Sequence, residues 1–327
     1  MLLCNLNFAQ AGFVEDSSAT LATRNFYLNR DFRQSGAPQA KAEEWAQGFI
    51  GQFQSGYTDG TVGFGLDALG TLGIKLDSSR DRRGTGLLPY GPESLQPVDE
   101  YSALGPTARM RLSQTQLKVG TLMPTHPLAY YSDTRLLPQT FTGAYLTSKE
   151  IADLTFTTAR LTEVKDRNSS HNDDIGYAGQ NSDHMDLLGG DYAFGKNLTL
   201  SYAHGELQDI YRQQYAGLTH VLPLAEGVSL RSDIRYFDSN DIGASKAGKI
   251  DNRNFNSMFT LSVGANRFSA AFQSLSGDSA FPYIDTSMPY VVNLVTYNSF
   301  TRANEKSWQL RHDYDFVALG IPGLTLM

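Results

Sequence analysis

Two arginines separated by one residue, Arg109 and Arg111, carry the first recognisable chemistry in the sequence. Their neighbours Ala108, Met110 and Leu112 are apolar, so a strand here places both guanidinium groups on the face opposite to the apolar one. A guanidinium group is planar, stays charged at any relevant pH and binds a carboxylate through two parallel hydrogen bonds. The spacing therefore predicts a surface that binds anionic groups.

The same alternation predicts four further basic side chains on the polar face of their strands: Lys118, Arg231, Arg235 and Arg311. A second interpretation stays open, in which the arginines brace the protein wall through ion pairs with Asp233, Asp313 or Asp315. Buried charges need partners in either case.

The patterns that resemble enzyme or cofactor sites lack the context that their chemistry requires. The glycines in residues 63–68 match a dinucleotide-binding fingerprint by letters, but they lie inside an alternating segment and open no helix. The 6 histidines have no metal-ligand spacing, and the single cysteine, Cys4, excludes a multi-cysteine metal site. We therefore expect no catalytic residue, no metal and no cofactor.

Apolar and polar residues alternate with a period of two along the whole chain, in segments of about ten residues. The clearest segment is residues 61–76, where Val62, Phe64 and Leu66 begin an apolar face opposite Gly63, Gly65 and Asp67. Short turn-like breaks alternate with long irregular stretches, as in outer-membrane barrels. The sequence therefore predicts an all-β protein, a transmembrane antiparallel β-barrel, and a soluble secreted β-protein is the alternative.

Composition narrows the possible classes. The net charge is −7, from 27 Lys plus Arg against 34 Asp plus Glu, and the basic residues are dispersed, which argues against nucleic-acid binding. No segment has the ~18 consecutive apolar residues of a membrane-spanning helix. Residues 1–11 form a short apolar stretch that ends in an A-x-A pattern, which indicates a residual signal peptide.

Ten short segments, in this order, resemble the OprD family of outer-membrane specific porins, also called the Occ channels. They are GFVEDS at 12–17, RNFYLNRD at 24–31, GTGLLP at 84–89, DTRLLPQ at 133–139, GGDY at 189–192, GELQDIY at 205–211, SDIRYFD at 232–238, EKSW at 305–308, YDF at 314–316 and GIPG at 320–323. The resemblance covers residues 12–327.

The resemblance implies a large porin barrel of about 18 strands in the outer membrane of a Gram-negative bacterium. We count about 14 to 15 strand-like segments, so we expect a single domain, residues 12–327, that is incomplete at its C-terminus. Residues 77–106 are expected to form a long extracellular loop and residues 123–143 an inward-folded constriction loop.

The resemblance also implies a ladder of basic residues that guides carboxylates. Arg24 and Arg160 are assigned to this ladder on the resemblance alone. In the two-residue alternation each falls on the same face as apolar neighbours, so periodicity does not support an inward direction. Residues expected in the constriction loop are Tyr130, Tyr131, Asp133 and Arg135. For Asp133 and Arg135 the alternative is an ion pair that only pins the loop to the wall.

Together these features predict a passive channel for small carboxylate-bearing solutes: basic amino acids, short peptides or aromatic and cyclic carboxylates. An outer-membrane β-barrel enzyme of the phospholipase or protease type is the alternative from another class. The expected partners are these solutes, outer-membrane lipid and lipopolysaccharide, and the barrel-assembly machinery. The expected oligomeric state is a monomer or a weak homotrimer.

Overall fold

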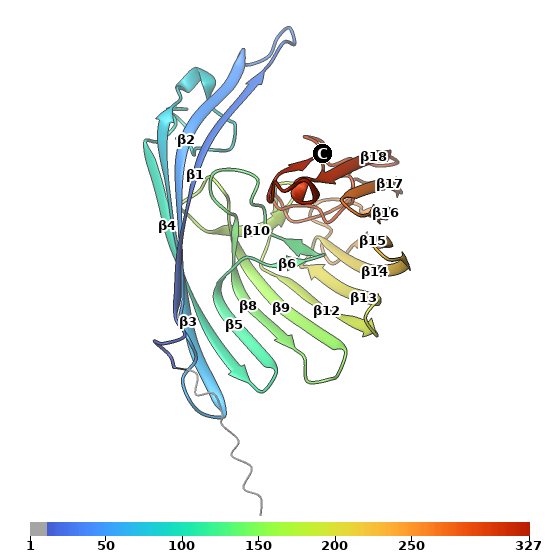
Figure 1. Ribbon diagram of the computed structural model, residues 1–327. Helices are drawn as coiled ribbons and strands as arrows, with labels where there is room; N and C mark the ends of the chain where they lie inside the picture. Colours follow the sequence, from blue (N-terminus) through green and yellow to red (C-terminus); the bar gives the residue numbers. More distant parts are fainter. Residues whose placement is uncertain (1–11) are drawn as a thin grey trace, which may run out of the picture. The chain divides into compact units, whose positions relative to one another are not determined.

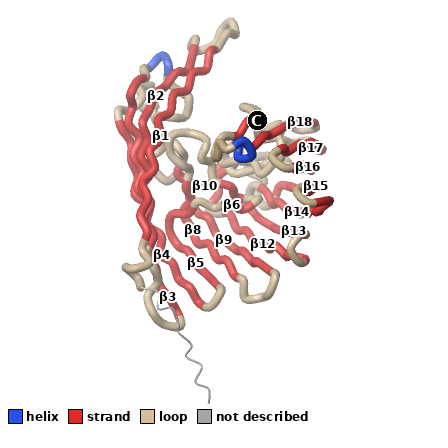
Figure 2. The backbone as a smooth tube through the Cα atoms, viewed as in Figure 1, coloured by secondary structure: helices blue, strands red, loops and turns tan. Residues whose placement is uncertain are grey.

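The computed structural model describes residues 12–327, and antiparallel strands dominate it (Figures 1 and 2). The signal peptide predicted for residues 1–11 lies outside the described residues. Within residues 12–327, no helix has the length and apolar character needed to cross a membrane. The described chain divides into two compact units.

Unit 1 contains residues 12–123, 131–146 and 163–173. Its strands β1 to β5 form an antiparallel meander in which each strand pairs with the next. Their bounds are Ser18–Asp31 (β1), Lys41–Gln54 (β2), Val62–Asp77 (β3), Glu100–Leu112 (β4) and Thr115–Leu122 (β5), with the 3-10 helix η1 at Arg80–Arg82. Thr140–Ser148 (β8) and Leu154–Lys165 (β9) each contain residues of both units.

Unit 2 contains residues 124–130, 147–162 and 174–327. Its meander runs from β9 to β12 and then through consecutive strands to β19. The bounds are Met185–Phe194 (β12), Leu198–Leu207 (β13), Tyr211–Ala225 (β14), Val228–Asp241 (β15), Asp251–Val263 (β16), Asn266–Ser276 (β17), Lys306–Asp315 (β18) and Thr325–Leu326 (β19). Two small hairpins, Thr125–His126 (β6) with Ala129–Tyr130 (β7) and Asp173–Tyr177 (β10) with Gln180–Ser182 (β11), and the 3-10 helix Phe316–Leu319 (η2) complete the elements.

Among residues 12–327, fourteen strands have eight or more residues, and β19 adds a short fifteenth to the meanders, in agreement with the predicted 14 to 15. The predicted alternation is present in β3, where Phe64 and Leu66 are exposed and Leu69, Thr71 and Gly73 are buried. We call the face that carries the buried residues the inner face of each unit. Large apolar side chains on the other face suit contact with lipid.

The inner face of unit 1 is covered by two loop segments. Leu87, Leu88, Leu136 and Leu137 are fully buried and pack with side chains of β2, β3 and β4 in one apolar cluster. The backbone N–H of Thr85 donates to the buried carboxylate of Glu44 on β2 at 2.9 Å. Loop residues thus take the place of lumenal water over part of the strand wall.

Two predicted loop boundaries are wrong by several residues. The loop expected at 77–106 spans only 78–99, because residues 100–106 form the first half of β4. Pro106 is tolerated there because β5 pairs with β4 only from Thr107 to Leu112, so no ladder hydrogen bond to β5 is required at the proline. The loop expected at 123–143 ends earlier, since Thr140 begins β8.

In unit 2, buried side-chain amides hold the strandless segment 277–305 against the inner face. Gln213 donates to the carbonyl of Pro282 at 3.0 Å, and Asn252 donates to the carbonyl of Ser279 at 2.7 Å. Gln273 donates to the carbonyl of Phe300 at 2.6 Å. These amides satisfy backbone groups of a segment that has no ladder of its own.

Candidate functional site

An ion pair fastens the segment 131–135 to the first strand of unit 1. Nη1 and Nη2 of Arg24 on β1 donate to the two carboxylate oxygens of Asp133 at 2.8 and 3.1 Å. Nη1 also donates to the carbonyl of Arg135 at 2.6 Å. Through Arg24, the carboxylate of Asp133 therefore ties this segment to β1, which is the kind of contact that the alternative interpretation described.

Arg24 faces inward although it lies on the same face of β1 as the apolar residues at every second position. Its strand neighbours of the same parity, Phe26 and Leu28, pack against the apolar cluster formed by the loops. The inner face of β1 is therefore apolar where a loop covers it. The resemblance implied the correct face for Arg24, and periodicity alone did not.

A further arginine, Arg167, was not among the predicted site residues, and it contacts the same segment. It donates to the hydroxyls of Ser132 at 3.2 Å and Thr134 at 2.5 Å. Burial, followed by the nearby positive charge of Arg135, lowers the pKa of Arg167. The sequence indicated the direction of Arg167 only through the two-residue alternation of β9. Arg167 follows the inward-facing residues Leu161 and Lys165 at an even spacing, beyond the end of the strand.

Arg135 also contacts the loop that contains Thr85. Its Nε donates to the carbonyl of Thr85 at 3.1 Å, and its Nη1 donates to the carbonyl of Thr134 at 2.8 Å. Tyr131 is half-buried in the same unit. The segment 131–135 of unit 1 thus brings together the positive charges of Arg24, Arg135 and Arg167 and the negative charge of Asp133.

Arg109 and Arg111 share a face of β4, as predicted. Their guanidinium carbons lie 4.6 and 4.4 Å from the ring centre of Tyr57. Lys118 is the cross-strand neighbour of Arg109. Arg109 is buried, and its Nε lies 2.7 Å from Oδ1 of Asp67, an ion pair whose angles are not those of a hydrogen bond.

Arg111 differs from Arg109 in exposure and in partners. It is exposed, and no carboxylate of the described chain forms an ion pair with it. Its contact with Tyr57 is a cation–π interaction, which orients the guanidinium group and leaves its N–H donors available.

In unit 2, two of the predicted basic residues are paired on their own strand. Arg235 binds Asp233 through two hydrogen bonds of 2.8 and 3.0 Å, and its guanidinium carbon lies 3.8 Å from the ring centre of Tyr290. Arg311 binds Asp313 at 2.9 and 2.7 Å. Arg231 is exposed and takes part in no ion pair among residues 12–327.

Arg160 does not lie where the resemblance implied. It forms two hydrogen bonds with Asp186, of 2.7 and 2.6 Å, and both residues alternate with buried neighbours such as Leu161 and Met185. Arg160 therefore lies on the outer face of unit 2. Arg160 lies an even number of residues from the exposed Phe156, and the strand alternation therefore indicated the outer face correctly.

Tyr130 contributes an aromatic contact within unit 2. Its ring stacks on that of Tyr290, with ring centres 6.0 Å apart and planes inclined by 20°. The carbonyl of Tyr130 accepts from the backbone N–H of Met288 at 3.0 Å. Because Tyr290 also supports Arg235, the β6–β7 hairpin and the segment 277–305 together position this guanidinium group.

No group of three or more His, Cys, Asp or Glu side chains suited to a metal ion occurs within residues 12–327. The groups that the structure offers to an anion are guanidinium groups beside aromatic rings, such as Arg111 on Tyr57. Such groups bind anions reversibly and require no covalent step.

Comparison with known proteins agrees with this geometry. The family model described as "outer membrane porin, OprD family" matches residues 11–327. The porin-like protein GalP of Pseudomonas putida is 41% identical over 321 residues, which cover 97% of this chain and 78% of GalP. These relatives are channel proteins and not enzymes.

Solved structures give the same result. OccK9 (OpdG) of Pseudomonas aeruginosa has a TM-score of 0.93 and 46% identity, covering 96% of this chain and 82% of OccK9. OpdK of the same species, solved with vanillate, has a TM-score of 0.89 and 39% identity, covering 96% of this chain and 82% of OpdK. The antiparallel β-barrel of large porins in the Gram-negative outer membrane, predicted from the alternation and the resemblance, is therefore confirmed. This chain belongs to the OprD family of outer-membrane porins.

Proposed function

We propose that this porin admits small carboxylate-bearing solutes by passive diffusion, and that its unpaired cations form the binding steps of the path. The observation that carries the proposal is the state of Arg111. It is exposed, oriented by Tyr57 and without a carboxylate partner in the described chain. A carboxylate can therefore bind it bidentately without displacing an existing ion pair.

The pairing pattern divides the predicted ladder into two classes. Arg111, Lys118 and Arg231 have no ion-pair partner within residues 12–327, and they are the cations that we assign to the solute. Arg109, Arg235 and Arg311 are each neutralised by an aspartate, and we assign to them the bracing of the wall. Weak sites of this kind let a solute bind and leave again, which conduction requires.

The solute class is proposed as carboxylates with an aromatic or cyclic body. Support comes from OpdK, whose structure was solved with vanillate, an aromatic carboxylate. The tyrosines at the basic residues, Tyr57 and Tyr290, offer flat apolar surfaces beside the cations. Basic amino acids and short peptides are the competing class.

Uptake by liposomes tests the proposal, with benzoate and arginine as the two solutes. The variants are Arg111→Gln and Lys118→Gln, and the matched control is Arg160→Gln, an arginine on the outer face. Removal of one charge-assisted hydrogen-bonded site costs about 1.5 kcal/mol, so we expect benzoate uptake to fall about tenfold at low concentration. Unchanged uptake in both variants, with normal folding, contradicts the assignment, and a preference for arginine contradicts the solute class.

A further inference from the structure

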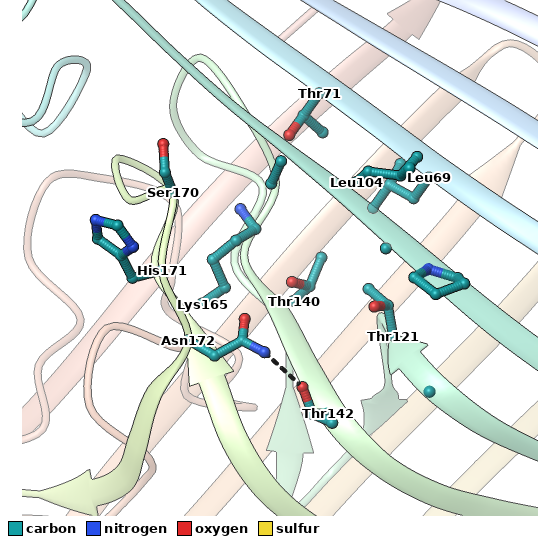
Figure 3. Close-up of a pocket in the computed structure, with 14 residues that line it drawn as sticks. Leu69, Thr71, Leu104, Thr121, Thr140, Thr142, Lys165, Ser170, His171 and Asn172 are labelled. Atoms are coloured by element: carbon teal, nitrogen blue, oxygen red, sulfur yellow. Dashed lines mark hydrogen bonds between the residues drawn. The ribbon is translucent and has the colours of Figure 1, made fainter.

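A cavity of about 570 Å³ opens within unit 1, and none of the basic residues of the proposed path lines it (Figure 3). The segment 170–172 borders it on one side. We call it the Lys165 pocket after its only lysine. Its lining includes Leu69, Thr71, Leu104, Pro106 and Lys165.

The ammonium group of Lys165 is buried without a partner. The residue is 5% exposed, and Nζ has no hydrogen bond or ion pair within the described chain. The adjacent residue Asp166 acts on it only through space. A buried charge is strongly unfavourable unless it is paired, so the arrangement calls for an anion from outside the chain.

A hydroxyl on a neighbouring strand is also unsatisfied. Oγ1 of Thr71 on β3 is buried and has no hydrogen-bond partner within residues 12–327. In Figure 3 this hydroxyl points toward the side of the pocket on which Lys165 lies. A hydroxyl donor and an ammonium group together suit one oxyanion.

The side chain of Asn172, in contrast, is already occupied. Its amide donates to Thr142 at 3.0 Å and to Glu163 at 2.9 Å. The polar half of the pocket thus has its unmet donors at Lys165 and Thr71.

The other half of the pocket is apolar and reaches the edge of the sheet. Leu69 and Pro106 line it, and so does Leu104, which is 77% exposed on the outer face of β4. Residues 100–106 of β4 extend beyond the pairing with β5, which ends at Thr107 with Gly120. The pocket therefore offers an apolar surface on which a short alkyl chain can pack.

We propose that the Lys165 pocket binds a small amphiphilic oxyanion, a carboxylate or a phosphate with a short apolar chain. The oxyanion is bound by Nζ of Lys165 and Oγ1 of Thr71, and the apolar chain packs against Leu69 and Leu104. The four torsions of the lysine side chain let Nζ turn toward the ligand. This site is separate from the cations assigned to the solute path.

Calorimetric titration of the purified porin in a non-ionic detergent tests the site, with hexanoate and its neutral analogue hexanamide as probes. Lys165→Met keeps a long apolar side chain, and Lys149→Met removes an exposed lysine from the turn before β9 as the matched control. We expect hexanoate to bind about tenfold more weakly to Lys165→Met and equally well to the wild type and Lys149→Met. Equal affinity in the wild type and Lys165→Met, or equal binding of hexanamide and hexanoate, overturns the proposal.

Crystals soaked with 6-bromohexanoate locate the ligand. Anomalous density for bromine beside Leu69 and Leu104 in the wild type, absent in Lys165→Met, supports the site, whereas bromine only at other positions overturns it. The measurement is independent of transport, because an Arg111→Gln variant that loses benzoate uptake is expected to retain this bromine peak.

Thermal unfolding checks that the variant is folded. Since Lys165→Met removes an unpaired buried charge, it is expected to unfold no earlier than the wild type without ligand. Hexanoate raises the unfolding temperature of the wild type and not that of the variant. An equal rise in both contradicts the proposal.

Nanodiscs separate the two sources of the oxyanion. If hexanoate binds more weakly in nanodiscs of phosphatidylglycerol or phosphatidylcholine than in the phosphate-free detergent, a lipid phosphate competes for the pocket. If the affinity is the same in nanodiscs and in detergent, the ligand is a soluble anion. Either result supports an oxyanion site at Lys165.

Discussion

Arg24 on β1 and Asp133 on the inward-folded segment are joined by two hydrogen bonds, although 109 residues separate them in the sequence. The same guanidinium group binds the carbonyl of Arg135. One side chain thus holds two points of a segment that has only the short β6–β7 hairpin as regular structure. This contact acts together with the apolar cluster around Leu136 and Leu137 to hold the segment against the wall of unit 1.

Loss of this pair is expected to loosen the loop. Asp133→Asn removes the charge and weakens both hydrogen bonds, at a cost of no more than about 1 kcal/mol because both side chains are about one third exposed. The loop then samples more positions, and the single-channel current is expected to become noisier and larger on average. Planar-bilayer recording measures this change.

The control for the loop variant is Asp31→Asn, which removes a carboxylate at the end of β1 that forms an exposed ion pair with Arg33. It is expected to leave the current unchanged. A quiet, unaltered current in Asp133→Asn would show that the apolar cluster alone holds the loop.

Arg109 is predicted to matter more for stability than for uptake. Its guanidinium group is buried against Asp67, so Arg109→Gln leaves a carboxylate of the inner face without its partner. Breaking a buried ion pair costs about 3–5 kcal/mol. We expect a lower unfolding temperature than for Arg111→Gln, measured by loss of the compact, heat-modifiable form on gels. Equal unfolding temperatures would contradict a bracing role for Arg109.

Acid is predicted to loosen the β6–β7 hairpin. Burial lowers the pKa of His126 from 6.5 to about 4, against the smaller opposing effect of Asp191. Between these two pH values the unfolded segment binds a proton and the folded segment does not. The free energy of unfolding of the hairpin is therefore highest above pH 6.5 and falls as the pH drops toward 4. The loss reaches up to about 3 kcal/mol and does not grow further below pH 4.

Hydrogen exchange of residues 124–130 at pH 7 and pH 4.5, corrected for the intrinsic pH dependence, measures this effect. Nδ1 of His126 accepts from the backbone N–H of Leu128 at 3.2 Å. His126→Asn keeps an acceptor at this place without a titrating ring, so its protection is expected to be independent of pH in this range. The same acid response in both proteins would exclude His126 as its origin.

Gly120 is predicted to tolerate no side chain. Its φ is +131°, and an added Cβ lies 2.3 Å from the carbonyl oxygen of Pro106. Gly120→Ala is therefore expected to lower the yield of folded protein or to cost at least about 1–2 kcal/mol. Gly70→Ala is the matched control, since nothing lies within 4 Å of its added Cβ. Equal yields of the two variants would contradict the close approach of β4 and β5 at this position.

The local two-residue alternation was sufficient to predict the strands and the faces on which many charged residues lie. Arg109, Arg111, Arg235 and Arg311 lie on the inner faces that alternation assigned to them. Periodicity also favoured the outer face for Arg160, against the implication of the resemblance. In each case the direction of a side chain follows from the two-residue period of the strand itself.

Local pattern failed where a loop covers a strand. Phe26 and Leu28 have the composition of a lipid-facing row, yet they pack beneath the loop cluster and share the inner face with Arg24. Arg167 lies beyond the end of β9 and was not singled out by the pattern, yet it is bound to the hydroxyls of Ser132 and Thr134. Apolar contact with a loop and apolar contact with lipid leave the same signature in a sequence.

The sequence by itself thus determined the antiparallel strands, their faces and the presence of inward cations, because these depend on neighbours within a few residues. The sequence also offered Asp233 and Asp313 as partners for Arg235 and Arg311, but only the tertiary structure decided the state of the other cations. Asp67 reaches Arg109 and Asp133 reaches Arg24, while Arg111 keeps only the ring of Tyr57 and Lys165 keeps no partner within residues 12–327. The physical reason is that Asp67 comes to Arg109 from the neighbouring strand and Asp133 comes to Arg24 from a distant loop, and no short-range period encodes either approach.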